Sequence, residues 1–132
     1  MLRTTILAFA AVGLALPASA GSSMLEGSWS GEGVVQTVAG APETVSCKVF
    51  YWQTSATVHE VAANCTSATF EFQQKGELTT VREGRYVGEF ENEQYQIHGK
   101  LRVLIDGEDP TGQAVTFTSD QANGEFELKK QL

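Results

Sequence analysis

The chain has 132 residues, 9 Lys and Arg against 16 Asp and Glu, and a formal net charge of −7. A negative surface repels phosphate backbones and anionic lipid, which argues against nucleic-acid binding and against electrostatic docking on membranes. We therefore expect no nucleic-acid partner and no membrane insertion. The length suits one domain with one hydrophobic core.

Residues 1–20 have the parts of a cleavable secretory signal peptide. Arg3 supplies the positive start, an apolar run follows, and Pro17 precedes small residues up to Ala20. The run is shorter than the roughly 20 apolar residues of a membrane-spanning helix, so we expect cleavage after Ala20. The residue directly after Ala20 is Gly21 and not Cys, so we expect a soluble export signal and not one of the lipoprotein type. The sequence predicts a periplasmic or secreted domain over residues 21–132.

From Gly27 onward, apolar residues recur with a period near two, which is typical of antiparallel β-structure. The clearest segment, 94–105, places Tyr95 and Ile97 on one face and His98 on the other. No segment after residue 21 shows the apolar spacing of a helix. The pattern predicts eight or nine strands, with segments at 27–38, 43–53, 58–66, 68–74, 77–82, 85–91, 94–105, 113–118 and 124–130.

Strands that each bury one face form either a closed up-and-down barrel or a sandwich. Closure removes the unpaired strand edges that template aggregation, which favours the barrel. The fold class is therefore all-β, a single small antiparallel β-barrel of about eight strands, with a β-sandwich as the alternative.

Cys47 and Cys65 are the two cysteines of the chain. In an oxidising compartment an even number of cysteines indicates a disulfide. A metal site is the alternative, but His59 alone near the two thiols leaves a zinc site half built. If segments 43–53 and 58–66 pair with Cys47 opposite Cys65, then Tyr51 lies opposite Val61 on the same face. Closing this loop stabilises the fold by about 3 kcal/mol in chain-entropy estimates.

Gly27-Ser28-Trp29 opens the first expected strand and resembles the Gly-x-Trp segment of the calycin barrels, the lipocalins, avidins and their relatives. In those barrels the Trp closes the bottom and the Gly lets the backbone pass closely. Together with Ser46-Cys47-Lys48-Val49 and Cys65, the segment is also similar to bacterial periplasmic metalloprotease-inhibitor barrels. The resemblance covers residues 27–66 and implies a small barrel with Trp29 at its bottom.

Residues for catalysis are scarce. His59 and His98 are the only candidates for a general base, and no Gly-x-Ser-x-Gly segment accompanies them. The acids of segment 106–109 lack the ligand spacing of an EF-hand, although calcium there is an alternative. We expect neither an enzyme, nor a cofactor, nor a metal site.

Aromatic residues are more numerous than candidate catalytic residues, and they indicate a ligand-binding or interface role. Segment 49–52, Val-Phe-Tyr-Trp, carries large groups on both faces of one strand. The candidate ligand-binding residues are Trp29, Phe50, Tyr51, Trp52, Tyr86 and Tyr95. Within a barrel, the residues expected to line or close a cavity are Trp29, Phe70, Phe72, Tyr86, Phe90 and Tyr95.

Three functions remain open at this stage. The first is a non-enzymatic barrel that binds a small apolar or amphipathic ligand. The second is an inhibitor of a secreted or envelope hydrolase, such as a protease, that inserts residues 21–26 into its target's cleft. The third is an envelope assembly partner that uses the aromatics of the 43–66 hairpin. A cavity favours the first, and a solid core with a projecting 21–26 segment favours the second.

Overall fold

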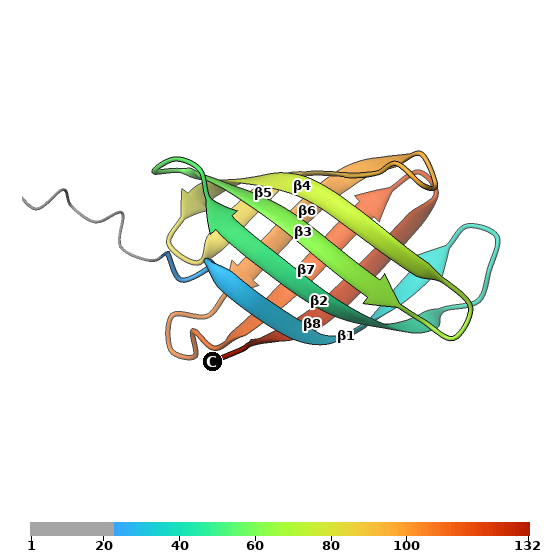
Figure 1. Ribbon diagram of the computed structural model, residues 1–132, viewed down its shortest axis with the longest axis horizontal. Coiled ribbons are helices and arrows are strands. Elements are labelled where there is room, and N and C mark those ends of the chain that lie inside the picture. Colours follow the sequence, from blue (N-terminus) through green and yellow to red (C-terminus); the bar gives the residue numbers. More distant parts are fainter. Residues whose placement is uncertain (1–22) are drawn as a thin grey trace, which may run out of the picture.

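A computed structural model describes residues 23–132, so the expected signal segment 1–20 lies outside the described residues. Eight antiparallel strands form a closed barrel (Figure 1). The described residues contain no helix, and hence none long and apolar enough to cross a membrane. The all-β barrel prediction is confirmed, and the sandwich alternative is wrong. The strands are β1 (Gly27–Thr37), β2 (Glu43–Gln53), β3 (Val58–Thr66), β4 (Glu71–Arg82), β5 (Arg85–Asn92), β6 (Ile97–Ile105), β7 (Gly112–Ser119) and β8 (Ala122–Lys130).

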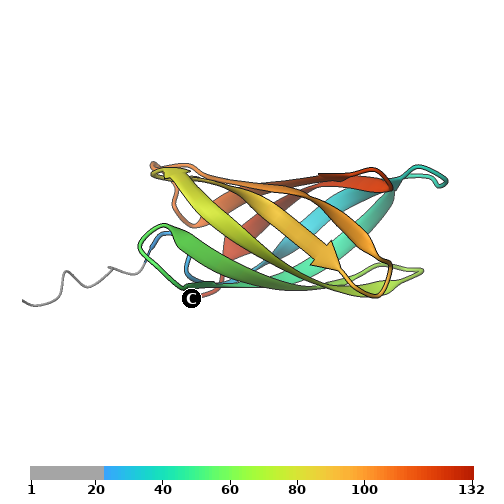
Figure 2. The same ribbon diagram turned by 90° about the horizontal axis from the view of Figure 1, so that it is seen from above.

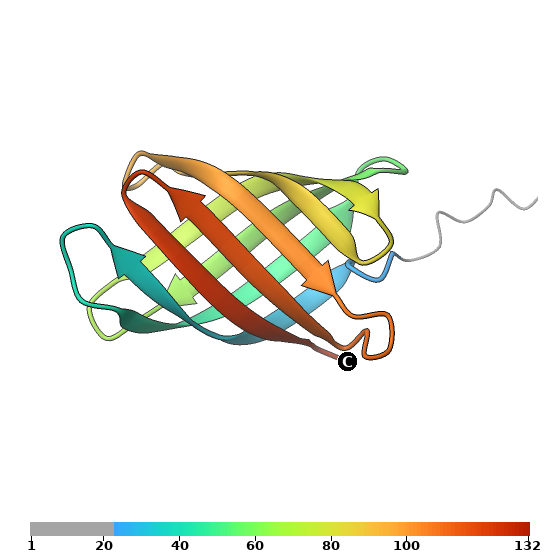
Figure 3. The same ribbon diagram turned by 180° about the vertical axis from the view of Figure 1, so that it is seen from behind.

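Each strand pairs with the next one along the chain, and β8 returns to pair with β1 (Figure 3). The strands are inclined to the long axis of the barrel in both side views (Figures 1 and 2). Loops 38–42, 67–70, 93–96 and 120–121 lie at one end, which holds a cavity and is called the open end. The opposite end, called the closed end, carries loops 54–57, 83–84 and 106–111 and the C-terminus (Figure 1).

Two of the predicted strands are one. Segments 68–74 and 77–82 belong to β4, because Gly76 between them stays extended and pairs with Val61 and Phe90. In the sequence this glycine suggested a boundary between two strands, but in the structure it lies inside one continuous strand. Strand β6 also starts later than predicted, since residues 93–96 form a turn that ends on Gln96 with φ of +53°.

The predicted disulfide and its register are both confirmed. Cys47 and Cys65 are bonded, lie opposite each other in the β2–β3 ladder, and face the interior. Tyr51 lies opposite Val61, as expected. The bond therefore joins two neighbouring strands on the inner wall of the barrel.

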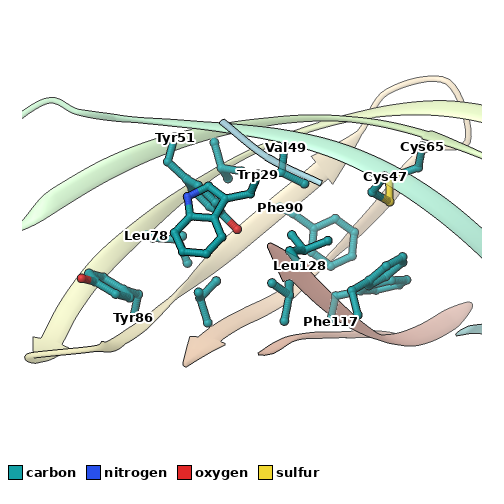
Figure 4. Packing of buried hydrophobic residues seen from close by; sticks show 14 of the residues in the cluster. Trp29, Cys47, Val49, Tyr51, Cys65, Leu78, Tyr86, Phe90, Phe117 and Leu128 are labelled. Atoms are coloured by element: carbon teal, nitrogen blue, oxygen red, sulfur yellow. A yellow bond between two sulfur atoms is a disulfide. The ribbon is translucent and has the colours of Figure 1, made fainter. Parts of the chain in front are cut away.

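Alternate residues of every strand point into the barrel and form one hydrophobic core (Figure 4). This is the arrangement that a side-chain period of two produces in a closed sheet. The largest fully buried side chains are Leu25, Trp29, Val45, Tyr51, His59, Leu78, Val103 and Leu128. Most of them come from the strand segments nearer the closed end.

Inward-facing glycines make room for inward-facing aromatic rings on the neighbouring strands. Gly33 of β1 lies opposite Phe126 of β8, and a Cβ added at Gly33 would stand 2.4 Å from the Phe126 ring and 2.2 Å from the Glu125 carbonyl oxygen. Neither distance is compatible with a side chain. Gly33 therefore lets β1 approach β8 closely where the barrel closes.

Substituting Gly33 tests this close approach. We expect Gly33→Ala to lower the free energy of unfolding by about 2 kcal/mol, because the new methyl group must displace backbone or ring atoms. Gly107→Ala is the matched control, since a Cβ at Gly107 meets no atom within 4 Å; its effect should stay within about 0.5 kcal/mol. Urea unfolding measures both values. Equal effects for the two variants would contradict the packing described here.

Candidate ligand-binding cavity

A cavity of about 520 Å³ opens at the open end of the barrel. This volume lies within the range of roughly 300–1,000 Å³ that is usual for small-molecule sites. Its wall comes from β1, from β4 to β8 and from the loops of the open end. Its aromatic side chains are Phe70, Phe72, Phe90, Tyr95 and Phe117.

The rings line the wall in pairs. Phe70 and Phe72 stack with centroids 5.4 Å apart, and Phe90 meets Phe117 edge to face at 5.3 Å. Phe72, Phe90 and Phe117 are inward positions of β4, β5 and β7, so strand alternation alone directs them at the cavity. Such pairings hold aromatic surfaces in fixed orientations, available to an apolar ligand.

A smaller void of about 40 Å³ lies next to the cavity, inside the barrel. Phe72, Phe90 and Phe117 touch both spaces, and the disulfide and Tyr51 border only the smaller one. The three rings therefore separate the cavity from the packed interior.

The polar residues of the cavity carry no formal charge. They are Thr37, Gln74, Asn92 and Gln121, together with the Tyr95 phenol. Among the described residues, no Asp, Glu, Lys, Arg or His lines this space. A charged ligand group buried here would have no oppositely charged side chain to pair with, so the cavity is suited to uncharged ligands.

Asn92 is the most deeply buried of these polar residues, with 2% of its surface exposed. Its Oδ1 accepts a hydrogen bond of 3.0 Å from the backbone N–H of Tyr95. This bond holds the turn between β5 and β6 and positions Tyr95 at the rim of the cavity, where the residue is 45% exposed.

The closed end is sealed by residues that precede β1. Leu25 is fully buried, and its carbonyl oxygen accepts a hydrogen bond of 2.9 Å from the Trp29 indole. Lys130 lies with its Nζ 5.6 Å from the Trp29 ring centroid and 3.4 Å from the Met24 carbonyl oxygen. These contacts leave the open end as the entrance to the cavity.

His59 is buried beneath this seal. Its Nε2 lies 2.5 Å from the Ser23 hydroxyl oxygen, and its ring meets Tyr86 edge to face at 5.6 Å. Its Nδ1 makes no hydrogen bond to any described residue. Burial lowers the pKa of His59, because the apolar surroundings disfavour the imidazolium, and the nearby charge of Glu26 opposes this effect only in part.

Two buried phenols also take part in the packing of the interior. The Tyr51 hydroxyl donates a hydrogen bond of 2.6 Å to Gln113 Oε1, and burial raises the pKa of Tyr51. Burial, with a smaller contribution from the charge of Glu83, raises the pKa of Tyr86 as well. Both residues stay neutral at physiological pH. Their rings pack in the core, and each side chain ends in a polar hydroxyl group.

The six predicted binding residues are not brought together. Tyr95 lines the cavity and Tyr51 borders the smaller void, whereas Trp29 and Tyr86 help to close the opposite end. Phe50 and Trp52 face outward from β2, with ring centroids 5.8 Å apart and Phe50 48% exposed. Of the residues expected to line or close a cavity, Phe70, Phe72 and Phe90 line it, whereas Trp29 and Tyr86 lie in the core near the closed end.

Asn92, Phe117 and Ile97 line the cavity but were missed as candidates. Strand alternation contained the signal, because Asn92 follows Phe90 by two residues and Phe117 follows Val115 by two. A polar residue at the end of a strand looks like ordinary turn chemistry in a sequence. Only the closed barrel shows that this position faces the cavity.

The fold defines the structural class, a small closed antiparallel β-barrel of eight strands, and comparisons with known proteins support that class. No protein-family model matches the sequence, and no curated protein matches it significantly. Solved structures do match: a redesigned β-barrel, mFAP1, bound to DFHBI, has a TM-score of 0.67 and 15% identity over 81% of this chain and 95% of that chain. Rv2717c from M. tuberculosis has a TM-score of 0.55 and 12% identity over 83% and 94% of the two chains.

A third match is the S-type phycobiliprotein lyase CPES from Guillardia theta, with a TM-score of 0.53 and 9% identity over 83% of this chain and 89% of that chain. At such identities the likeness shows the fold alone. The small antiparallel barrel that the calycin resemblance implied is therefore confirmed as a fold.

The burial of His59 generates a pH dependence of stability. Because its pKa is lowered in the folded state, the unfolded chain binds the proton more readily below the ordinary value of about 6.5. The stability contributed by neutral His59 is therefore full above about pH 6.5 and is lost as the pH falls towards the folded-state pKa. We expect His59→Gln to flatten this part of the curve, measured by urea unfolding at about pH 7.5 and pH 5.5.

His98 supplies the control for this experiment. It is exposed on the outer face of β6, where an ion pair such as its 3.1 Å contact with Glu91 contributes little to stability, so His98→Gln should change the free energy of unfolding little at either pH. A His59→Gln protein that loses as much stability on acidification as the original would contradict the assignment.

Proposed function

We propose that the protein is an exported, non-enzymatic β-barrel that binds one small apolar or amphipathic ligand in the cavity at its open end. The single observation that carries the proposal is an uncharged cavity of about 520 Å³ with aromatic walls, in a barrel whose opposite end is sealed. Eight-stranded barrels have room for one small ligand when side chains do not fill the interior.

The comparison with solved structures supports this proposal at the level of the fold. The barrel mFAP1, which shares the fold, was solved with the small molecule DFHBI bound to it. That ligand belongs to mFAP1 and identifies no ligand for this chain. It shows that a barrel of this size accommodates a small molecule.

Export to the periplasm or beyond the cell is part of the proposal. It rests on the signal-like segment 1–20 and on the Cys47–Cys65 disulfide, which persists in oxidising compartments. Secretion of the natural protein, followed by N-terminal sequencing, tests it. A mature chain that begins near Gly21 would support export, and a chain that retains Met1 in the cytoplasm would refute it.

The inhibitor alternative finds little support in the packing before β1. Leu25 is buried in the barrel and Ser23 is hydrogen-bonded to His59, so this segment would have to leave the core to enter a protease cleft. The envelope-partner alternative retains one observation, the outward-facing pair of Phe50 and Trp52 on β2. Exposed aromatic pairs are frequent anchors of protein interfaces.

Blocking the cavity tests the ligand-binding proposal. We expect the neutral dye N-phenylnaphthylamine to bind with one site per barrel and to gain fluorescence on leaving water. Ile97→Trp places a large ring in the cavity and should weaken binding at least tenfold, roughly 1.4 kcal/mol. Fluorescence titration measures the affinity.

Two control variants separate the cavity from the outer surface. Leu104→Trp adds the same ring on the same strand, but at an outward-facing, exposed position, and should leave dye affinity unchanged. Phe50→Ala removes an exposed aromatic from β2 and should also have no effect. Binding that survives Ile97→Trp and disappears in Phe50→Ala would refute the cavity as the site.

A further inference from the structure

The side-chain amide of Asn92 has a donor to spare at the cavity wall. A backbone N–H can only donate, so the bond from Tyr95 must end on Oδ1, and this orients the amide. The Nδ2 group then lies on the other side of the side chain, and within the described part of the chain the Tyr95 N–H is the only hydrogen-bond partner of the Asn92 side chain. A side chain that is 98% buried thus presents an unused N–H donor to a space that a ligand can enter.

Gln74 and Gln121 are the other side-chain amides of the cavity wall, and neither has a fixed orientation. No described residue hydrogen-bonds to either side-chain amide, so each can present its carbonyl or its amide group to a ligand. Asn92 is the residue whose orientation is fixed, and it alone offers a defined donor at a defined position.

The charge around the entrance has one sign. The loops of the open end and the strand residues that border them contain Glu43, Glu71, Glu93 and Asp120, and they contain no Lys, Arg or His. Thr69 Oγ1 donates to both Glu43 carboxylate oxygens, at 2.7 and 2.9 Å, which lowers the pKa of that group. The entrance is therefore negative over the whole physiological pH range and repels anions.

We propose that the ligand is an uncharged aromatic compound whose hydrogen-bond acceptor, such as a ketone or amide carbonyl, meets Asn92 Nδ2 while its rings lie among the phenylalanines of the wall. This specificity rests on the proposed function, since it assumes that the cavity is the binding site. Carboxylate-bearing amphiphiles are excluded by two independent features, the acidic entrance and the absence of a cation in the described cavity.

Three dyes of similar size separate these features. Prodan is a neutral naphthalene with a ketone, and its propyl analogue has a methylene group in place of the carbonyl. Anilinonaphthalene sulfonate has a comparable ring system and a negative charge. We expect prodan to bind about tenfold more tightly than either of the others, the size of effect that one satisfied buried donor produces. Added salt should improve only the binding of the sulfonate.

Asn92→Asp removes the donor and keeps the turn, because a carboxylate oxygen still accepts the Tyr95 N–H. Prodan affinity should fall about tenfold, and its emission should shift to the blue as the ketone loses its hydrogen bond. The propyl analogue should change much less. Asn123→Asp is the matched control, since it makes the same amide-to-carboxylate change at an exposed, outward-facing position of β8 outside the cavity wall; it should leave prodan binding nearly unchanged.

The outcomes distinguish this inference from the proposed function. If prodan and its propyl analogue bind equally well and Asn92→Asp weakens both alike, the acceptor preference is overturned and the cavity remains a binding site. If the sulfonate binds as tightly as prodan, the exclusion of anions is overturned. If neither these dyes nor N-phenylnaphthylamine bind, both proposals fail. The comparison of dyes on the original chain requires no variant and stands even if Asn92→Asp does not fold.

Discussion

The hydrogen-bonded pairing of β1 with β8 holds the rest of the structure in place. It runs from Trp29 opposite Lys130 to Thr37 opposite Ala122 and turns a meander of strands into a tube without edges. Closure gives all inward side chains a single shared interior, whose width is set by the number and tilt of the strands. Each large inward residue must then fit against its neighbours across that width, and Gly33 opposite Phe126 shows how closely they are matched.

Within this fixed width the two halves of the interior are used differently. At the closed end Trp29 and Leu25 fill the space and bind each other through the indole N–H, so the end is sealed by packing as well as by a hydrogen bond. At the open end the phenylalanines stack against one another along the wall and leave the middle free. An interior with a cavity forgoes packing contacts, and the disulfide on the adjacent wall stabilises the strands there by restricting the unfolded chain.

The polar and charged groups also differ between the closed end and the open end. His59, unpaired at Nδ1, is held neutral under the closed end, and Asn92 offers its amide within the open end. The carboxylates around the entrance stand outside the cavity, in water, where their charge acts on an approaching ligand without being buried. The barrel thus combines an apolar interior, one oriented donor and a negatively charged entrance, and these three features are the basis of the ligand chemistry proposed above.

The sequence by itself determined the properties that depend on neighbours along the chain. Alternation with a period of two predicted the all-β class and the inward set of most strands. The parity of Cys47, Tyr51, Val61 and Cys65 agreed with the register of one hairpin, which the structure confirms. It did not determine which inward residues surround empty space. Phe90 and Trp29 are equally buried and follow the same alternation, yet one lines the cavity and the other seals the far end. That difference depends on the order and stagger of the strands around the closed barrel. Only the tertiary structure therefore decided that Asn92, a strand-end amide of ordinary appearance, faces the cavity, and that Leu25, in a short segment before the first strand, belongs to the core.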